Sequence, residues 1–309
     1  MNRLAGIILA AVGLIVSVVS ILQILPGFTG AGVALILGGG LVIGLSFVNG
    51  PESSDGERMS TPATLANIFL SPTEVFKNLR TYPRFLVGLI VIVLLGTIYT
   101  NLFFNRLGPD TIVNYTIDKT LEMSMIANNE EAKKQVEAGR PQALLDARSV
   151  DRRAAQAANS FVGTLFVNVI GAAIFLVLAL AMGGKLNFFQ GLSIFVYAGF
   201  PVYVIRFLLN TLLLYLKDPS DIHPILGQQS LIQDSLNFLV KSAEHPVLYS
   251  FLTSFSLLGI YWVWLLATGF KNAGEKVTGT IAWTGAIGVY TALMLLGVVL
   301  ALLFPSFMS

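Results

Sequence analysis

The sequence predicts an all-α fold, a polytopic membrane helix bundle with about seven transmembrane helices. The 309 residues are 55% hydrophobic and only 12% charged, whereas a soluble domain carries about 25% charged residues. Seven windows are also apolar and long enough to cross a hydrocarbon core about 30 Å thick. These windows cover residues 4–25, 30–48, 85–104, 161–182, 188–216, 246–270 and 281–304.

Charge and cysteine content exclude several classes of protein. The formal net charge is +2, and no run of Lys or Arg supports a nucleic-acid partner. The chain contains no Cys, so disulfides, thiolate zinc sites and cysteine nucleophiles are excluded. The main partner that the composition predicts is the lipid bilayer, and no cofactor is expected.

Residues 1–48 are expected to form an N-terminal transmembrane hairpin. The alternative is a signal peptide, but the first window is longer than the usual apolar region of about 7–15 residues. It also lacks a small-x-small cleavage site. Residues 26–30 (PGFTG) predict a tight turn into the second window.

Glycines in the second window suggest a helix contact. Gly40 and Gly44 are four residues apart and therefore share one face of a helix. Another helix can approach closely where side chains are absent, which predicts self-association or a contact with other membrane proteins. The alternative, that these are glycines merely tolerated in a membrane helix, stays open.

Residues 49–61 are polar and rich in Gly and Ser, which predicts a linker before a second domain over residues 62–309. Two short interfacial helices are expected over residues 62–82. Ser71 is a typical N-cap, with Pro at the first helical position and Glu74 three residues after the cap.

The second of these helices is amphipathic. Phe76 lies on its apolar face, whereas Lys77 and Arg80 lie on the opposite side. An amphipathic helix with basic and aromatic flanks is expected in the headgroup layer. Packing of its apolar face on the protein itself is the alternative.

Residues 105–160 form the one long polar region and predict an extramembrane helical insert. One helix is expected over residues 129–138, closed by Gly-Arg-Pro at 139–141. A further polar helix over residues 142–159 is expected to run directly into the next span. The region contains no His, and a catalytic domain is therefore not expected there.

The distribution of basic residues favours a cytoplasmic N-terminus. Outside the long polar insert, the segments on the N-terminal side of the membrane carry most of the Lys and Arg. The basic residues of the insert weakly favour the opposite orientation of the N-terminus, but long loops cross a membrane largely regardless of charge.

Arg206 lies near the middle of the span over residues 188–216. An arginine at such a position costs about 2.5–3.5 kcal/mol on insertion scales. No acidic residue lies in any window to pair with it. Pro201 cannot donate a hydrogen bond to the carbonyl of Tyr197, four residues before it, and the helix is therefore expected to bend there. The polar stripe of this span consists of Tyr197, Pro201, Tyr203, Arg206 and Asn210.

Two interpretations of Arg206 remain open. It can line an interior groove that binds a lipid phosphate or another anion. It can also be a snorkelling side chain that is bonded to backbone carbonyls and to Asn210.

No catalytic or metal-binding motif occurs in the sequence. His223 and His245 are the only imidazoles, and each precedes a proline, as turn residues often do. Nearby carboxylates could complete a metal site with them, but no known ligand spacing is present. The motifs of intramembrane proteases, P-loops and dinucleotide sites are also absent. We therefore expect a protein that is not an enzyme and has no resident metal.

Three segments resemble the Yip1 family, in particular its bacterial branch. They are residues 68–80 (IFLSPTEVFKNLR), the Tyr197-x-x-x-Pro201 step, and residues 264–271 (WLLATGFK). The resemblance covers roughly the last four-fifths of the chain. It implies a five-span domain with a cytoplasmic amphipathic N-terminal part, here in a bacterial inner membrane.

The eukaryotic members resemble trafficking factors that associate with small GTPases. Their acidic motif is not evident in this chain, and the N-terminal hairpin is a further departure from the family. GTPase binding is therefore not carried over.

Two functional hypotheses follow. The first is a non-enzymatic scaffold or interaction protein of the membrane, active in membrane organisation or a trafficking-like process. The second is a membrane subunit of a transporter or export complex, with a lipid or anion path near Arg206. Transporters usually contain internal repeats with broken helices in matching positions. One Pro-broken span and no repeat are found here, which favours the scaffold.

Overall fold

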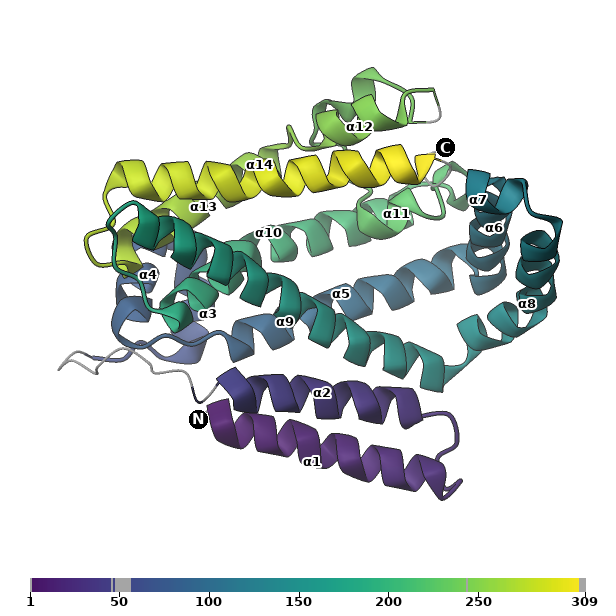
Figure 1. The fold of residues 1–309 in the computed structure, drawn as a ribbon, viewed down its shortest axis with the longest axis horizontal. Helices are drawn as coiled ribbons and strands as arrows, with labels where there is room; N and C mark the ends of the chain where they lie inside the picture. Colours follow the sequence, from purple (N-terminus) through teal and green to yellow (C-terminus); the bar gives the residue numbers. More distant parts are fainter. Residues whose placement is uncertain (1, 46, 48–56, 243, 306–309) are drawn as a thin grey trace. The chain divides into compact units, whose positions relative to one another are not determined.

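The computed structural model of the chain describes residues 2–45, 47, 57–242 and 244–305. Within these residues it contains helices and no β-strand beyond two isolated bridges (Figure 1). The all-α membrane helix bundle is thereby confirmed. In the described part of the chain, five helices are long and apolar enough to cross a membrane: α1 (Asn2–Ile21), α5 (Leu86–Leu107), α9 (Val150–Ala181), α10 (Phe188–Leu216) and α14 (Gly279–Leu303).

Two of the expected windows differ from these five helices. The second window forms α2 (Thr29–Leu45), an apolar helix of 17 residues. The window over residues 246–270 is not one continuous span, and that prediction is wrong. It is divided into α12 (Pro246–Thr253) and α13 (Leu257–Ala273).

Hydrogen-bond acceptors at the start of α13 explain the break between α12 and α13. Asp234 accepts hydrogen bonds from the backbone N–H groups of Leu257 and Leu258, through its carbonyl and its carboxylate respectively, both at 3.0 Å. The hydroxyl of Ser256 accepts from the N–H of Gly259 at 2.9 Å. These acceptors satisfy the first N–H groups of α13, so a new helix begins there.

The chain divides into two compact units, and several long helices contribute to both. Unit 1 comprises residues 1–95, 150–203 and 261–290, and unit 2 comprises residues 96–149, 204–260 and 291–309. The hairpin that we expected as a domain over residues 1–48 is part of unit 1. Residues 49–56 of the expected linker lie outside the described residues.

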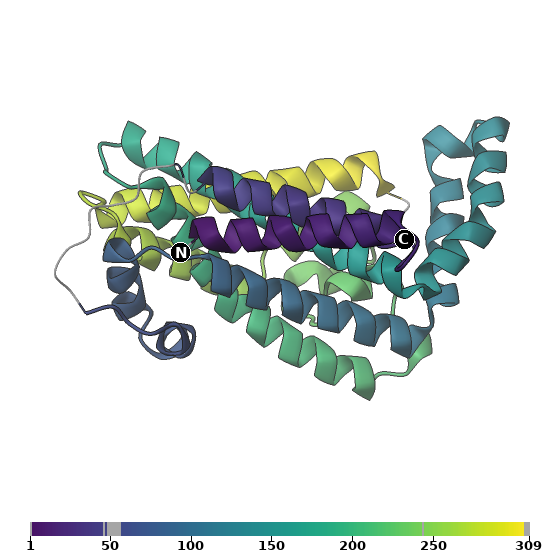
Figure 2. The ribbon, with the colours of Figure 1, turned by 90° about the horizontal axis from the view of Figure 1, so that it is seen from below.

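In unit 1, α1 and α2 form the expected hairpin and run side by side (Figures 1 and 2). The turn between them includes Gly27, whose φ of +90° lies in the left-handed region that favours glycine. A Cβ at Gly32 would lie 2.8 Å from the carbonyl oxygen of Gly13. A Cβ at Gly39 would lie 2.5 Å from the backbone nitrogen of Ala10. Glycine is therefore required for this close approach of the helices.

Gly40 and Gly44, by contrast, lie outside this seam, because a Cβ at either would meet nothing within 4 Å. The face of α2 that packs on α9 is lined by Ala31 and Ala34 against Ala158. Small residues again determine how closely the two helices approach.

Unit 2 has its own apolar core between the second half of α5, α6 (Pro109–Glu122) and the second half of α10. Its buried members are Tyr99, Phe103, Ile112, Leu214, Ile222 and Leu231. The Tyr99 hydroxyl donates to the carbonyl of Gly227 at 2.7 Å, which ties α5 to α11 (Leu226–Gln229). Short 3-10 helices, η1 (Pro219–Asp221) and η2 (Leu236–Leu239), occupy the same long loop.

The polar insert of unit 2 contains α6, α7 (Ser124–Ala127) and α8 (Glu130–Arg148), and α6 and α8 pack together (Figure 1). The predicted helix end at residues 139–141 is wrong, because α8 continues through Pro141. The chain instead breaks at Ser149, within the helix expected over residues 142–159, and α9 begins at Val150. As expected, α9 then carries polar residues directly into an apolar span.

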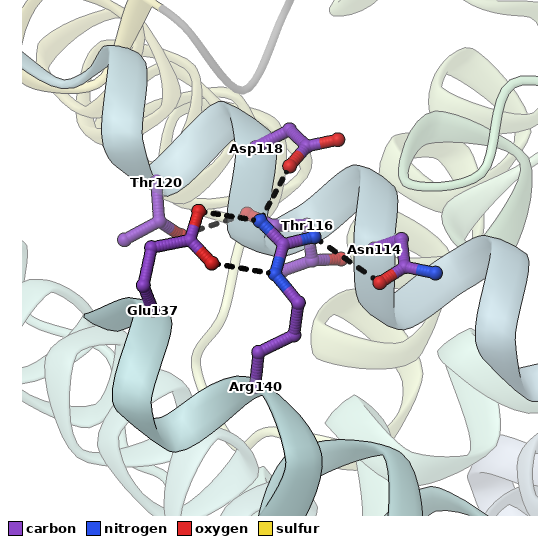
Figure 3. A network of polar contacts seen from close by, with 6 residues as sticks. All are labelled: Asn114, Thr116, Asp118, Thr120, Glu137 and Arg140. Carbon is purple, nitrogen blue, oxygen red and sulfur yellow. Dashed lines mark hydrogen bonds and ion pairs between the residues drawn. The ribbon is translucent and has the colours of Figure 1, made fainter. Parts of the chain in front are cut away.

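Arg140 explains how α8 passes the proline (Figure 3). Its guanidinium donates two hydrogen bonds to the Glu137 carboxylate, both at 2.9 Å, one turn back along the helix. It also donates to Asp118 at 2.7 Å and to Asn114 at 3.1 Å on α6. These bonds bridge the turn that the missing N–H of Pro141 weakens, and they fasten α8 to α6.

We expect acid to weaken both a turn of α8 and its contact with α6. The Arg140 guanidinium holds the pKa of Glu137 below its ordinary value of 4.5, and Arg148 holds that of Asp110 below 3.8, in both cases mainly through hydrogen bonds. Carboxylates with depressed pKa values stabilise the folded state above their unfolded pKa. That stabilisation is lost as the pH falls below 4.5 and on through the lower folded values.

Spin labels on Cys introduced at the exposed positions Thr111 and Ala138 would measure this change as a broader distance distribution at low pH. Arg140→Ala should broaden the distribution already at pH 7. A narrow distribution in Arg140→Ala at pH 7 would contradict the role of the arginine.

Candidate functional site

The polar stripe of α10 does not face one common space. Tyr197 is fully buried and Asn210 is 2% exposed, whereas Tyr203 is 45% exposed. Pro201 lies inside the helix, as expected from the sequence. The residues share one helix, but their surroundings differ.

Asn210 binds the loop of unit 2 through hydrogen bonds. Its side-chain oxygen accepts hydrogen bonds from the backbone N–H groups of Leu231 at 2.9 Å and Ile232 at 3.2 Å. Buried backbone N–H groups need such acceptors, and Asn210 supplies one where the loop leaves α11. Its oxygen therefore serves as a loop anchor.

Arg206 lies one turn before Asn210 and is half-buried. Its Nε is buried and has no hydrogen-bond partner among the residues that the structure describes. A buried donor without an acceptor is costly, so this position favours an acceptor from outside the described chain. Arg206 thus stays a candidate contact for an anionic group.

The expected helices before the first span of the second domain are α3 (Thr61–Leu70) and α4 (Pro72–Thr81). Ser71 occupies the N-cap position of α4, but its side chain makes no capping hydrogen bond. The side-chain cap belongs instead to Ser60, which accepts from the N–H of Ala63 at the start of α3. Glu74 lies in the first turn of α4 and pairs with Lys77 at 3.2 Å.

The apolar face of α4 packs inside unit 1. Phe76 is fully buried, and a Cβ at Gly269 of α13 would lie 3.0 Å from its ring. The Gln190 amide donates to the carbonyl of Arg80 at 2.7 Å and satisfies an acceptor at the end of α4. Arg80 itself reaches Glu275 at 3.0 Å. The apolar side of α4 therefore contacts protein, while its charged side is exposed.

Arg106 stabilises the end of α10, a role that the sequence did not reveal. Its Nε donates to the carbonyl of Leu214 at 3.4 Å, and its guanidinium also donates to the carbonyl of Lys217 at 3.2 Å. The last carbonyls of a helix lack internal donors, so this arginine of α5 caps the end of α10. A separation of more than 100 positions hides such a contact from inspection of the sequence.

His223 is hydrogen-bonded within unit 2. Nδ1 of His223 accepts from the N–H groups of Ile225 and Leu226, both at 3.1 Å, and its Nε2 lies 3.1 Å from the Tyr115 hydroxyl. Within the described part of the chain, no group of three or more His, Cys, Asp or Glu could hold a metal ion. His223 instead caps the start of α11.

Comparison with known proteins assigns the chain to a family. The model of the Yip1 domain matches residues 66–303, a range that begins after the N-terminal hairpin. No curated protein and no solved structure matches the chain. The family match and the apolar helices together make this a multi-pass membrane protein. Because the match covers well over half of the 309 residues, the protein belongs to the Yip1 domain family.

Proposed function

We propose that the protein is a non-enzymatic membrane scaffold or interaction protein. In this role it binds other membrane proteins and organises a membrane or serves a trafficking-like process. We place it in a bacterial inner membrane with its N-terminus in the cytoplasm. The distribution of basic residues outside the polar insert supports this orientation.

The exposure of α8 is the observation that carries the proposal. None of the 19 residues of this helix is buried. Arg140 and Arg148 nevertheless hold it against α6 through ion pairs with Asp118 and Asp110. A solvated helix that is fixed in this way leaves its outer side chains available to a partner.

Site-specific photocrosslinking tests the proposal. A photoreactive amino acid at the exposed Lys134 of α8 is expected to give discrete protein adducts in native membranes. The same amino acid at Val177, which is 65% exposed on the apolar α9, serves as a lipid-facing control. Arg140→Ala should abolish the Lys134 adducts without changing the amount of inserted protein. Equal adducts with and without Arg140 would argue against a partner surface on α8.

A transporter subunit is the second candidate, because the buried Nε of Arg206 lacks an acceptor in the described chain. The packing of α10 favours the scaffold. In α10, 61% of the most apolar window is buried within the protein, against 17–28% for the other four candidate spans. Its own side chains Leu192 and Ile194 are fully buried.

Flux measurements separate the two candidates. Proteoliposomes with the purified protein are expected to move phospholipid and phosphate no faster than protein-free vesicles. Arg206→Ala should match the parent. A flux that is present in the parent and lost in Arg206→Ala would overturn the scaffold in favour of a substrate path.

A further inference from the structure

The N-terminal end of α5 carries an arginine that has no acidic partner among the residues that the structure describes. Arg84 lies two residues before Leu86, the first residue of the helix. Its guanidinium donates to the Thr64 hydroxyl at 2.6 Å and to the Asn78 side-chain oxygen at 3.1 Å, both of which are neutral. Its Nε is buried without a hydrogen-bond partner, and no carboxylate of the described chain pairs with it.

Asn78 brings a second arginine to the same place. Its amide nitrogen donates to the carbonyl of Glu57 at 3.0 Å, and its oxygen accepts from the N–H of Met59 at 3.3 Å. The segment that carries Arg58 is thereby held beside Arg84. Burial is the main cause that lowers the pKa of Arg84, and the charge of Arg58 acts in the same direction. Two positive charges thus lie close together.

The helix adds a third positive contribution. The first N–H groups of α5 have no partners within the helix, and the macrodipole places partial positive charge at this end. An arginine at the N-terminus of a helix is therefore unfavourable unless an anion compensates it. Phosphate groups commonly bind where such N–H groups and a basic side chain converge.

Tyr197 supplies an independent sign of an unfilled polar site. The side chain is fully buried, and its hydroxyl has no hydrogen-bond partner among the described residues. A Cβ at Gly88, four residues after Arg84, would lie 3.5 Å from the ring carbon that bears this hydroxyl. The hydroxyl therefore ends beside the first turn of α5, where an acceptor would satisfy it.

We propose that Arg84 and the first turn of α5, beside the Tyr197 hydroxyl, bind a phosphate group. The candidate span begins at Leu86, two residues after Arg84, and the end of a span is where lipid phosphates are found. The phosphate can belong to an anionic phospholipid or be free in solution. This site is distinct from α8, and it does not depend on the partner surface proposed there.

Titration calorimetry of the full chain in an uncharged detergent distinguishes the sources. The probes are dioctanoyl phosphatidylglycerol, dioctanoylglycerol, which has the same tails and no phosphate, and inorganic phosphate. We expect phosphatidylglycerol to bind and dioctanoylglycerol not to bind. Competition by inorganic phosphate would identify a site for free phosphate as well. Failure of phosphate to compete would assign the site to a lipid headgroup.

Variants identify the residues. Arg84→Ala should weaken phosphatidylglycerol binding at least tenfold, equivalent to about 1.4 kcal/mol. Asn78→Asp should do the same with little change in shape, because it gives Arg84 a carboxylate inside the protein. Arg84→Lys keeps the charge but loses the planar fork, and should lie between Arg84→Ala and the parent.

Arg80→Ala is the matched control, because it removes one positive charge from the same helix region. Arg80 is already paired with Glu275 and should not affect binding. Parental affinity in both Arg84→Ala and Asn78→Asp would overturn the proposal. So would equal binding of dioctanoylglycerol, or an equal loss of affinity in Arg80→Ala. Thermal unfolding of each variant confirms that the measured protein is folded.

Discussion

Phe76→Ala is expected to undock α4 from unit 1 and to cost about 3–5 kcal/mol, the usual range for a buried Phe. The ring is fully buried and faces Gly269, where no side chain could fill the space that it leaves. Hydrogen exchange followed by mass spectrometry should show amides of α3 and α4 exchanging about a hundredfold faster or more, since each 1.4 kcal/mol is a factor of ten.

Leu70→Ala is the matched control for Phe76→Ala. Leu70 ends α3, next to the same helix, but it is 82% exposed, so its truncation removes almost no buried surface. We expect exchange in α3 and α4 to stay at the parental rate. Equal protection in Phe76→Ala and Leu70→Ala would show that α4 is not held by its apolar face.

Gly39→Leu is expected to separate α1 from α2. Even the first carbon of a side chain at Gly39 would lie 2.5 Å from the backbone nitrogen of Ala10, which is closer than atoms can pack. Overpacking of this kind typically costs about 1–3 kcal/mol. Because a backbone atom is the neighbour, the strain cannot be relieved by a rotamer change, and the helices must move apart.

Crosslinking reports this separation without background, because the chain has no Cys. The Arg3 guanidinium lies 5.1 Å from the centre of the Phe47 ring, at the open end of the hairpin. A Cys pair at these positions should react with a short bifunctional thiol reagent in the parent and about tenfold less in Gly39→Leu.

Gly40→Leu is the control for Gly39→Leu at the adjacent position, where a Cβ meets nothing within 4 Å. It should crosslink as the parent does. If Gly40→Leu instead changes the oligomeric state in detergent, the predicted self-association through Gly40 and Gly44 gains support. A parental crosslink in Gly39→Leu would contradict the glycine seam.

The glycines illustrate how far the sequence could define the hairpin. Length and hydropathy were sufficient to predict two apolar helices and the turn between them. The spacing of Gly40 and Gly44 matched a helix contact, yet Gly13, Gly32 and Gly39 form the seam. Which face of α2 meets α1 depends on how both helices are rotated, and hydropathy does not encode this when every face is apolar.

The polar insert shows a similar limit. Gly-Arg-Pro at residues 139–141 is a sound stop signal in isolation. Arg140 overrides it through Glu137 on its own helix and Asp118 on α6. The acceptor on α6 lies 22 positions away, so the local sequence could not reveal it. Likewise, the break before α13 depends on Asp234, which local hydropathy over residues 246–270 does not report.

Composition and the length of the apolar segments by themselves determined the fold class, because apolar segments long enough to span a bilayer can be solvated only by lipid. The residues of the Yip1-like segments also determined the family. Tertiary structure alone decided which polar groups find partners. Among the described residues it left Arg84 without a carboxylate and Tyr197 without a hydrogen-bond partner, while Asn210 anchors a loop and Arg106 caps α10. A hydrogen bond requires two groups to meet within about 3 Å, and only the folded chain brings distant residues so close.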